Sequence, residues 1–311
     1  MSGDLFDQAI AASPLAGAIG LRWRPGLPTI ASPMRQSVDA ENATVETDEG
    51  SPVFLKIYRA DGLQEVELDV VGAATASAAA LGIGPALRFV LPAQWALAVD
   101  YLAPPWRPTM LNDLAEPAIF EAAVAIRRTF QSAPALPRRH DVFATIEAQY
   151  AKAAARAVAL PSDVEALLAW SREAASAIRA AGFDLAPCHN DGSASAYMSG
   201  AAGRLMLVDF DEAGQSDPFY DLALLLNEVS AFGDFWSPGV ELQTGAASAR
   251  LVNRCRLYAA ADDIYRGFWG WNMSATSPRR NVEFLKYGEW RLLRARLALR
   301  EPGFAARLNE L

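Results

Sequence analysis

The chain has 311 residues, which is more than a single hydrophobic core usually supports, so we expect two lobes. With 52% hydrophobic and 21% charged residues, its composition is that of a packed globular protein and not of a disordered one. A formal net charge of -8 provides no overall basic field that would attract nucleic acid phosphates. Nucleic acid is therefore not expected as a partner.

A β-hairpin is predicted early in the chain. Residues 36–47 alternate loosely between polar and apolar, Asp48-Glu49-Gly50 supplies a turn, and residues 52–58 have the sequence Pro-Val-Phe-Leu-Lys-Ile-Tyr. The second strand of this hairpin carries Lys56.

A helix and two further strands complete a small α+β unit. The helix is expected at about 63–81, and strand-like runs follow at 87–91 and 95–102. The uncharged stretch 70–87 is long enough to raise the question of a membrane span, but it consists mostly of Ala, Gly and Ser and ends in helix-breaking residues. We therefore expect a buried helix here and no contact with a membrane.

Beyond residue 102 the pattern changes to long helices rich in Ala and Leu. Helices are predicted at about 109–132, 140–157, 161–182, 216–231, 246–272 and 280–298, with one strand at 204–210. The predicted fold class is α+β and two-lobed, with a small N-terminal lobe of antiparallel sheet plus helix at 1–102 and a larger, mostly helical lobe at 103–311.

Carboxylates concentrate in one unit of loop, strand and helix. The unit begins Cys-His-Asn-Asp at residue 188 and continues through Leu-Val-Asp-Phe-Asp-Glu to Asp-Pro-Phe-Tyr-Asp-Leu-Ala. Phosphoryl transfer needs one carboxylate to orient and accept the proton of a hydroxyl and another to hold Mg²⁺ against the nucleotide phosphates. Asp191 and Asp209 have the order and spacing for these two roles.

These residues resemble the choline/ethanolamine kinase and aminoglycoside phosphotransferase superfamily, which has a protein-kinase-like fold. His189-Asn190-Asp191 matches the catalytic-loop pattern His-x-Asp, and Asp209-Phe210-Asp211 matches the pattern Asp-Phe-[Asp/Glu] after the next strand. Gly214, Asp217-Pro218 and Asp221-Leu222-Ala223 continue the match, which covers about residues 30–300. In this reading Asp217 and Asp221 are structural, and His189 braces its loop.

The resemblance implies ATP and Mg²⁺ as cofactors and a role for each matched residue. Asp191 is then the catalytic base, Asp209 and Asp211 are metal ligands, and Lys56 contacts the α- and β-phosphates. The adenine-contacting hinge is expected at Asp100, Tyr101 and Leu102. Three carboxylates are candidate partners of Lys56, namely Glu65, Glu67 and Asp69, of which we favour Glu67 or Asp69.

The C-terminal part is most similar to choline/ethanolamine kinases, in which a Trp-rich helix helps to enclose a quaternary ammonium. A permanent cation without hydrogen-bond donors is held by aromatic faces, supplemented by a carboxylate at some distance. Trp269, with Tyr265 or Trp271, is a candidate for the aromatic faces, and Glu228 is a candidate for the charge. The same aromatic residues also fit an ordinary helical core.

Two features depart from the superfamily pattern. Ala196 stands where the pattern has a metal-binding Asn, and a methyl group cannot bind Mg²⁺, although the neighbouring Ser195 carries an oxygen. The phosphate-covering stretch 32–37 has no Gly, and Pro33 lacks a backbone donor, which leaves Arg35 as a replacement phosphate contact.

The sequence therefore predicts an ATP-dependent phosphotransferase that acts on a small, amine-bearing alcohol such as choline or ethanolamine. Two alternatives stay open: a catalytically silent protein of the same fold, and a kinase for an aminoglycoside or another sugar. The two Cys residues form no disulfide or metal-ligand pattern and the start has no secretory signal, so a cytoplasmic location is expected. The oligomeric state is not predicted.

Overall fold

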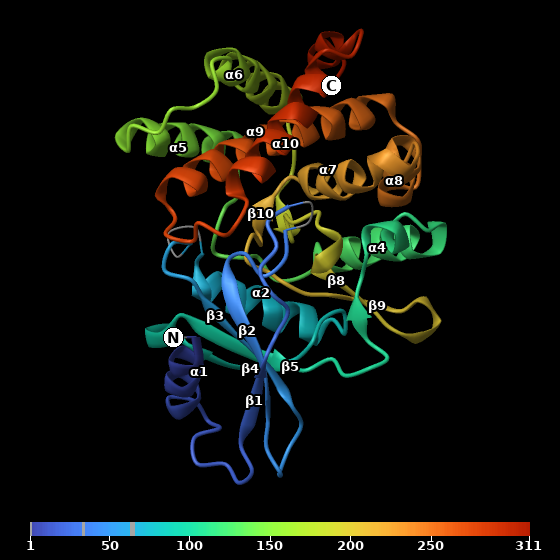
Figure 1. Ribbon diagram of the computed structural model, residues 1–311. Helices are drawn as coiled ribbons and strands as arrows, with labels where there is room; N and C mark the ends of the chain where they lie inside the picture. Colours follow the sequence, from blue (N-terminus) through green and yellow to red (C-terminus); the bar gives the residue numbers. More distant parts are fainter. Residues whose placement is uncertain (1, 33–34, 63–65) are drawn as a thin grey trace.

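The computed structural model describes residues 2–32, 35–62 and 66–311, and it has a sheet-containing lobe and a larger helical lobe (Figure 1). In the described residues, the smaller lobe has a five-stranded antiparallel sheet in the spatial order β1-β2-β3-β5-β4. Its strands are β1 (Arg22–Pro25), β2 (Ala40–Glu46), β3 (Val53–Tyr58), β4 (Leu87–Leu91) and β5 (Ala96–Asp100). The predicted hairpin is confirmed, since β2 and β3 pair with Ala43 opposite Leu55.

The alternation of side chains along β3 decides where Lys56 points. Leu55 and Ile57 are buried with Phe6 of α1 (Ser2–Ala11), in a cluster on one face of the sheet. Because successive strand residues point to opposite faces, Lys56 points to the other face. That face meets the larger lobe.

Helix α2 (Leu68–Ala80) confirms the buried helix that the sequence predicts, beginning later than expected. The buried side of α2 includes small residues such as Ala74 and Ala78, which belong to the main hydrophobic core. In the part of the chain that the structure describes, no helix is long and apolar enough to cross a membrane.

Eight α-helices occur among the described residues of the larger lobe. They are α3 (Leu111–Leu114), α4 (Pro117–Phe130), α5 (Val142–Ala155), α6 (Val164–Ala181), α7 (Pro218–Val229), α8 (Trp236–Thr244), α9 (Ala249–Thr276) and α10 (Phe284–Leu299). The helix predicted at 109–132 is divided because Pro117 begins a new helix. Helices α9 and α10 pack closely at Gly270, where an added Cβ would lie 2.7 Å from the Cα of Gly288.

Short strand pairs position the carboxylate-bearing loops. Strand β7 (Ala186–Cys188) pairs with β10 (Gly214–Ser216), and β8 (Tyr197–Ser199) lies between β6 (Arg107–Pro108) and β9 (Leu205–Leu207). The strand predicted at 204–210 is thus shorter than expected. Since Cys188 lies opposite Gly214, the loops that carry Asp191 and Asp209 meet at one edge.

Candidate active site

The loop after β7 is held by the imidazole of His189. This side chain is fully buried, and its Nε2 lies 2.8 Å from the backbone oxygen of Val208, in the segment that leads to Asp209. The predicted bracing role of His189 is confirmed by this contact. Asn190 follows with a positive φ of 62° and donates from its side-chain amide to the backbone oxygen of Glu212 (3.1 Å). Asn tolerates this left-handed conformation better than most residues do.

A buried arginine that the sequence motifs did not indicate anchors the same loop. Arg127, near the end of α4, is 1% exposed and donates to the backbone oxygen of Asp191, to Asp221 and to the hydroxyl of Tyr197. Asp221 in turn accepts a hydrogen bond from the backbone N–H of Asn190 (2.8 Å). The expected structural role of Asp221 is therefore confirmed. In the sequence, only the interruption of the apolar face of α4 by Arg127 could have indicated that this arginine is buried.

The Asp191 carboxylate is buried and remains ionised. Its Oδ1 accepts hydrogen bonds from the backbone N–H (2.9 Å) and the hydroxyl (2.7 Å) of Ser193. Burial raises the pKa of Asp191, but Arg266 and Arg35 outweigh this effect, so the pKa lies below its usual range. A carboxylate in this state can accept a hydrogen bond from a hydroxyl at neutral pH.

Lys56 joins the two acids of the Asp-Phe-Asp motif. Its ammonium pairs with Asp209 and lies 2.6 Å from Oδ2 of Asp211, whose Oδ1 accepts from the hydroxyl of Tyr58 (2.6 Å). Burial and the neighbouring Asp209 raise the pKa of Asp211, while the two carboxylates hold the pKa of Lys56 well above its ordinary value against the effect of burial. Asp209 has a positive φ of 67°, a strained conformation of a kind that concentrates at functional sites.

The expected ion pair between Lys56 and Glu67 or Asp69 is wrong. Both carboxylates are exposed, and Glu67 lies 4.0 Å from Arg138 instead. The reason is that the face of β3 that carries Lys56 meets the Asp209 loop directly. Glu65 lies outside the described residues.

The Asp209 and Asp211 carboxylates fit a magnesium ion. They converge on one point, and a dication there would relieve the repulsion that raises the pKa of Asp211. Among the described residues no group of three His, Cys, Asp or Glu side chains could hold a metal, so the remaining ligands would be phosphate oxygens and water, as is usual for Mg²⁺. Ala196 is buried with a methyl group only, and the Ser195 hydroxyl donates to the backbone oxygen of Arg35 (3.2 Å).

Arg35 belongs to the segment that is expected to cover the phosphates, and its side chain points toward Trp269 of the larger lobe. Pro33 and Met34 lie outside the described residues, and the Arg35 guanidinium lies 2.7 Å from Asp39 and 5.0 Å from the centre of the Trp269 ring. The Arg35 side chain thus extends into the larger lobe, and the expected contact between Arg35 and phosphate stays a prediction. The expected hinge follows β5: Asp100 pairs with Arg88, and the Tyr101 N–H donates to Pro52 (3.1 Å).

A polar pocket lies next to Asp191. The described residues that line it are Arg35, Asp191, Gly192, Ser193, Leu224, Asn227, Glu228, Asp262, Arg266, Tyr287 and Arg291. Burial raises the pKa of Glu228, and the nearby Asp191 adds to this, while Arg294 and Arg291 oppose it. In the described part of the chain no basic side chain forms an ion pair with Glu228. We call this cavity the Asp191 pocket.

The predicted aromatic residues lie behind this pocket and not on its described lining. Trp269 and Tyr265 are buried, at 2% and 3% exposure, and Trp271 is partly buried. Trp269 contacts the pocket residue Tyr287, with ring centres 5.8 Å apart and nearly perpendicular planes. Tyr287 is the only aromatic residue among the described lining residues.

Alternating ion pairs surround the Asp191 pocket, and sequence motifs did not predict them. We call them the ion-pair chain, which runs Asp39, Arg35, Glu212, Arg266, Asp262, Arg291, Asp263 and Arg294. Arg266 lies 2.8 Å from Glu212, and Arg291 lies 2.6 Å from Asp262. With four acids and four arginines, the ion-pair chain carries no net charge.

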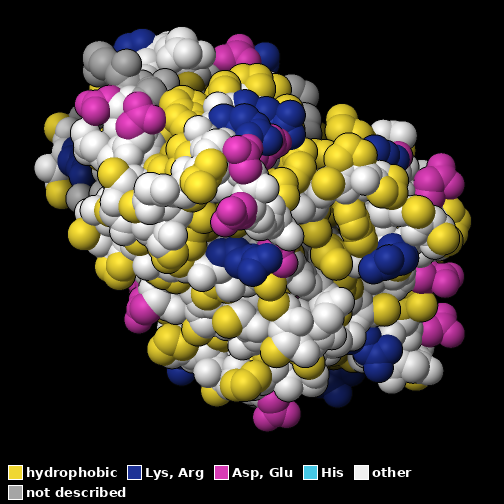
Figure 2. Space-filling model, turned by 90° about the horizontal axis from the view of Figure 1, so that it is seen from below, with side chains coloured by type: hydrophobic (Ala, Val, Ile, Leu, Met, Phe, Trp, Pro, Cys, Tyr) yellow, Lys and Arg dark blue, Asp and Glu magenta, His cyan; other side chains and the backbone are white. Residues whose placement is uncertain are grey.

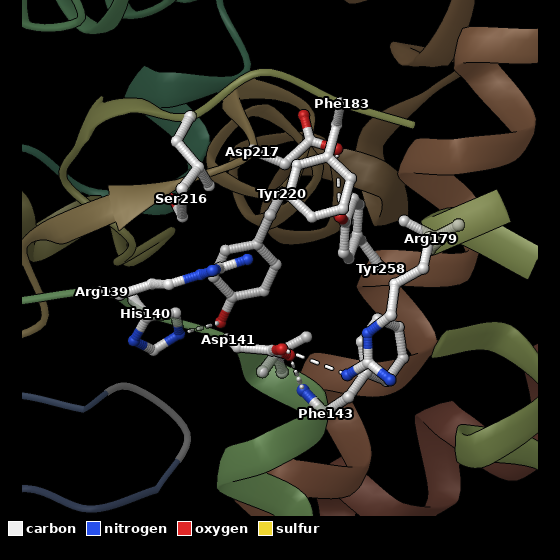
Figure 3. Close-up of a pocket in the computed structure, with 13 residues that line it drawn as sticks. Arg139, His140, Asp141, Phe143, Arg179, Phe183, Ser216, Asp217, Tyr220 and Tyr258 are labelled. Carbon is white, nitrogen blue, oxygen red and sulfur yellow. Dashed lines mark hydrogen bonds and ion pairs between the residues drawn. The ribbon is translucent and has the colours of Figure 1, made fainter. Parts of the chain in front are cut away.

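Tyr220 is one of the residues that line a second pocket (Figure 3). His140 and Tyr220 stack there, and the Nε2 of His140 lies 3.3 Å from the Tyr220 hydroxyl. The same hydroxyl donates to Asp262 (3.0 Å), which lines the Asp191 pocket. Tyr220 therefore helps to position an acid of the ion-pair chain.

On the face seen in Figure 2, the Lys and Arg side chains of the described residues lie in separate places, several of them beside Asp or Glu.

Residues 31–258 match the phosphotransferase enzyme family (APH). The chain belongs to this family. Among solved structures, this phosphotransferase is similar to a choline/ethanolamine kinase family protein from Mesorhizobium loti, with 23% identity, a TM-score of 0.79, and coverage of 100% of this chain and 99% of that one. A search of curated proteins gave no match.

Two further solved structures resemble the chain at lower identity. Choline kinase LicA from Streptococcus pneumoniae has 16% identity and a TM-score of 0.74, with coverage of 96% of this chain and 98% of that one. Spectinomycin phosphotransferase, in complex with ADP and spectinomycin, has 10% identity and a TM-score of 0.62, with coverage of 99% and 98%. These similarities confirm the predicted protein-kinase-like fold.

Proposed function

We propose that this phosphotransferase transfers the γ-phosphate of ATP to the hydroxyl of a small, amine-bearing alcohol. The observation that carries the proposal is that Asp191 and Glu228 line one pocket, beside the loop that presents Asp209 and Asp211 to Lys56. The pocket thus has one carboxylate that can accept a hydrogen bond from the hydroxyl of the acceptor and one that can bind its amine.

Asp191 is the residue that orients the hydroxyl. Since Ser193 donates twice to Oδ1, Oδ2 remains to accept the hydrogen bond of the acceptor alcohol. The hydroxyl oxygen bonds to the γ-phosphorus, the bond from that phosphorus to the bridging oxygen of ADP breaks, and the proton passes to Asp191. Arg127 and His189 hold the loop so that this geometry is set before substrate binds.

Asp209 and Asp211 are the residues that would hold Mg²⁺, which neutralises charge on the phosphates when bound. Lys56 lies between them and is placed to exchange one of these carboxylates for the α- and β-phosphates. The segment formed by Asp100, Tyr101 and Leu102 leaves the sheet after β5, and we assign it to the adenine.

The experiment is a measurement of ADP release by purified protein with ATP, Mg²⁺ and a panel of amino alcohols. We expect turnover that falls by at least about 100-fold in Asp191→Asn, which keeps the shape of the side chain but removes its charge. Wild-type turnover no greater than that of Asp191→Asn over the whole panel would refute the proposal.

A second candidate function is a catalytically silent protein that binds nucleotide. The buried methyl group of Ala196 favours it, because a methyl group offers no oxygen to a second metal position. Nucleotide titration separates the two functions. Binding that tightens with Mg²⁺ in the wild type but not in Asp209→Ala supports the enzyme, whereas metal-independent binding without turnover supports the silent protein.

A further inference from the structure

Arginines of this chain already occupy the aromatic faces around the Asp191 pocket. The three pairs are Arg35 over Trp269 (5.0 Å from guanidinium carbon to ring centre), Arg266 over Tyr265 (4.7 Å) and Arg291 over Tyr287 (5.9 Å). Each distance lies within the range in which a cation is attracted to an aromatic ring.

Trp269 in particular has little surface left for a ligand. Its side chain lies edge-on to Phe284 and Tyr287, at 5.7 and 5.8 Å between ring centres, and only 2% of the residue is exposed. A ligand cation could reach its face only by displacing Arg35. The Arg35 side chain is 12% exposed, and its guanidinium is held by Asp39 at 2.7 Å, with Glu212 at 3.8 Å.

The charge that remains for a ligand comes from carboxylates. The ion-pair chain is neutral, and Asp191 and Glu228 are the only charged residues among the described lining residues that lie outside it. An ammonium group with N–H bonds can donate to a carboxylate in a charge-assisted hydrogen bond, whereas a quaternary ammonium has no hydrogen to donate. Recognition by a carboxylate therefore favours an amine that carries N–H bonds.

We propose that the acceptor is a small alcohol with one protonated primary or secondary amine, that Glu228 binds this amine, and that Arg35 excludes a quaternary ammonium from Trp269. This inference rests on the proposed function and narrows its substrate class. It also disfavours an aminoglycoside, because several ammonium groups would need more lining carboxylates outside the ion-pair chain than Asp191 and Glu228.

The first test uses the wild-type protein and a series in which methyl groups replace N–H bonds one at a time. The series is ethanolamine, N-methylethanolamine, N,N-dimethylethanolamine and choline, with kcat/KM measured by ADP release and affinity by calorimetry. We expect kcat/KM to fall along the series, and ethanolamine to exceed choline by about tenfold or more, in line with the loss of charge-assisted hydrogen bonds.

The second test uses variants that separate the two residues. Glu228→Gln is expected to raise the KM for ethanolamine by about 10- to 100-fold and to change kcat less, since Glu228 binds the amine and not the reacting hydroxyl. Arg35→Gln uncovers the Trp269 ring and is expected to raise the ratio of choline to ethanolamine kcat/KM by about tenfold. Arg256→Gln is the matched control, because Arg256 covers Trp236 at 4.3 Å and does not line the pocket. It should leave the ratio unchanged.

The outcomes distinguish the inference from the function on which it rests. A wild-type kcat/KM for choline equal to or above that for ethanolamine would overturn the inference and leave phosphotransfer to an amino alcohol standing. An unchanged ratio in folded Arg35→Gln would overturn the role of Arg35. No binding and no turnover above Asp191→Asn with any member of the series would overturn both.

Discussion

Replacing Arg127 with Met is expected to destabilise the protein more than any comparable change of a surface arginine. Arg127 and Asp221 are each 1% exposed, and the Arg127 guanidinium also bonds to the backbone oxygen of Asp191 and to Tyr197. Met has a similar volume, so the change mainly leaves the Asp221 carboxylate buried without its counter-ion. Breaking a buried pair in this way costs about 3–5 kcal/mol.

The assay is denaturant unfolding, with Arg128→Met as the matched control. Arg128 is the next residue of α4 and is exposed, and it donates to the backbone oxygen of Leu242 (2.9 Å), so its loss should change the free energy of unfolding by about 0.5 kcal/mol or less. The double variant Arg127→Met with Asp221→Asn removes both charges. It should therefore be more stable than the sum of the single changes predicts.

The reasoning would be refuted by an Arg127→Met variant within about 1 kcal/mol of Arg128→Met. It would also be refuted by strict additivity in the double variant, because additivity would mean that the two charges do not interact. Neither measurement depends on the identity of the acceptor, so this test of how the Asp191 loop is anchored is independent of the proposed function.

Three further predictions concern groups around the site. Burial lowers the pKa of His140 from 6.5 to about 4, so the folded state binds a proton less readily than the unfolded state. The free energy of unfolding should therefore fall by up to about 3 kcal/mol as the pH drops from 6.5 to 4. His140→Gln should flatten this part of the curve of unfolding free energy against pH. Tyr220→Phe removes the hydroxyl that donates a hydrogen bond to Asp262 and should lower the free energy of unfolding by about 1–2 kcal/mol, measured by denaturant unfolding. An unchanged free energy of unfolding would show that this hydrogen bond does not stabilise the protein. Ala196→Asn supplies an amide oxygen and should lower the Mg²⁺ concentration for half-maximal turnover by about tenfold, measured by metal titration at fixed ATP. If this Mg²⁺ concentration is unchanged in the folded variant, a metal position at residue 196 is contradicted.

Local patterns in the sequence were sufficient for much of the smaller lobe. The β2–β3 hairpin and the buried helix α2 follow from alternation, a turn and a run of small apolar residues, all of which act over a few neighbouring residues. The two carboxylate-bearing loops that contain Asp191 and Asp209 were likewise evident, because their carboxylates are close in sequence. Strand β1 (Arg22–Pro25) was missed, since its four residues are mostly exposed and show no alternation of apolar side chains.

Contacts between distant segments account for the errors at the site. The partner of Lys56 depends on which face of β3 meets the larger lobe, and carboxylates at the start of α2 gave no information on this. The position of Arg35 over Trp269 likewise depends on the packing of the two lobes, which no local pattern in the sequence predicts.

The Asp191 pocket shows why a count of its charged residues misleads about the ligand. Three arginines line it, which by number alone would favour an anion, yet each is neutralised by carboxylates that lie in and behind the lining. The two lining carboxylates that lie outside these pairs are Asp191 and Glu228. The arginines then act mainly through the space that they fill, because a guanidinium placed on an aromatic ring prevents a ligand cation from binding there. Under the proposed mode of binding, selectivity depends on which cation, that of Arg35 or that of the acceptor, occupies the face of Trp269.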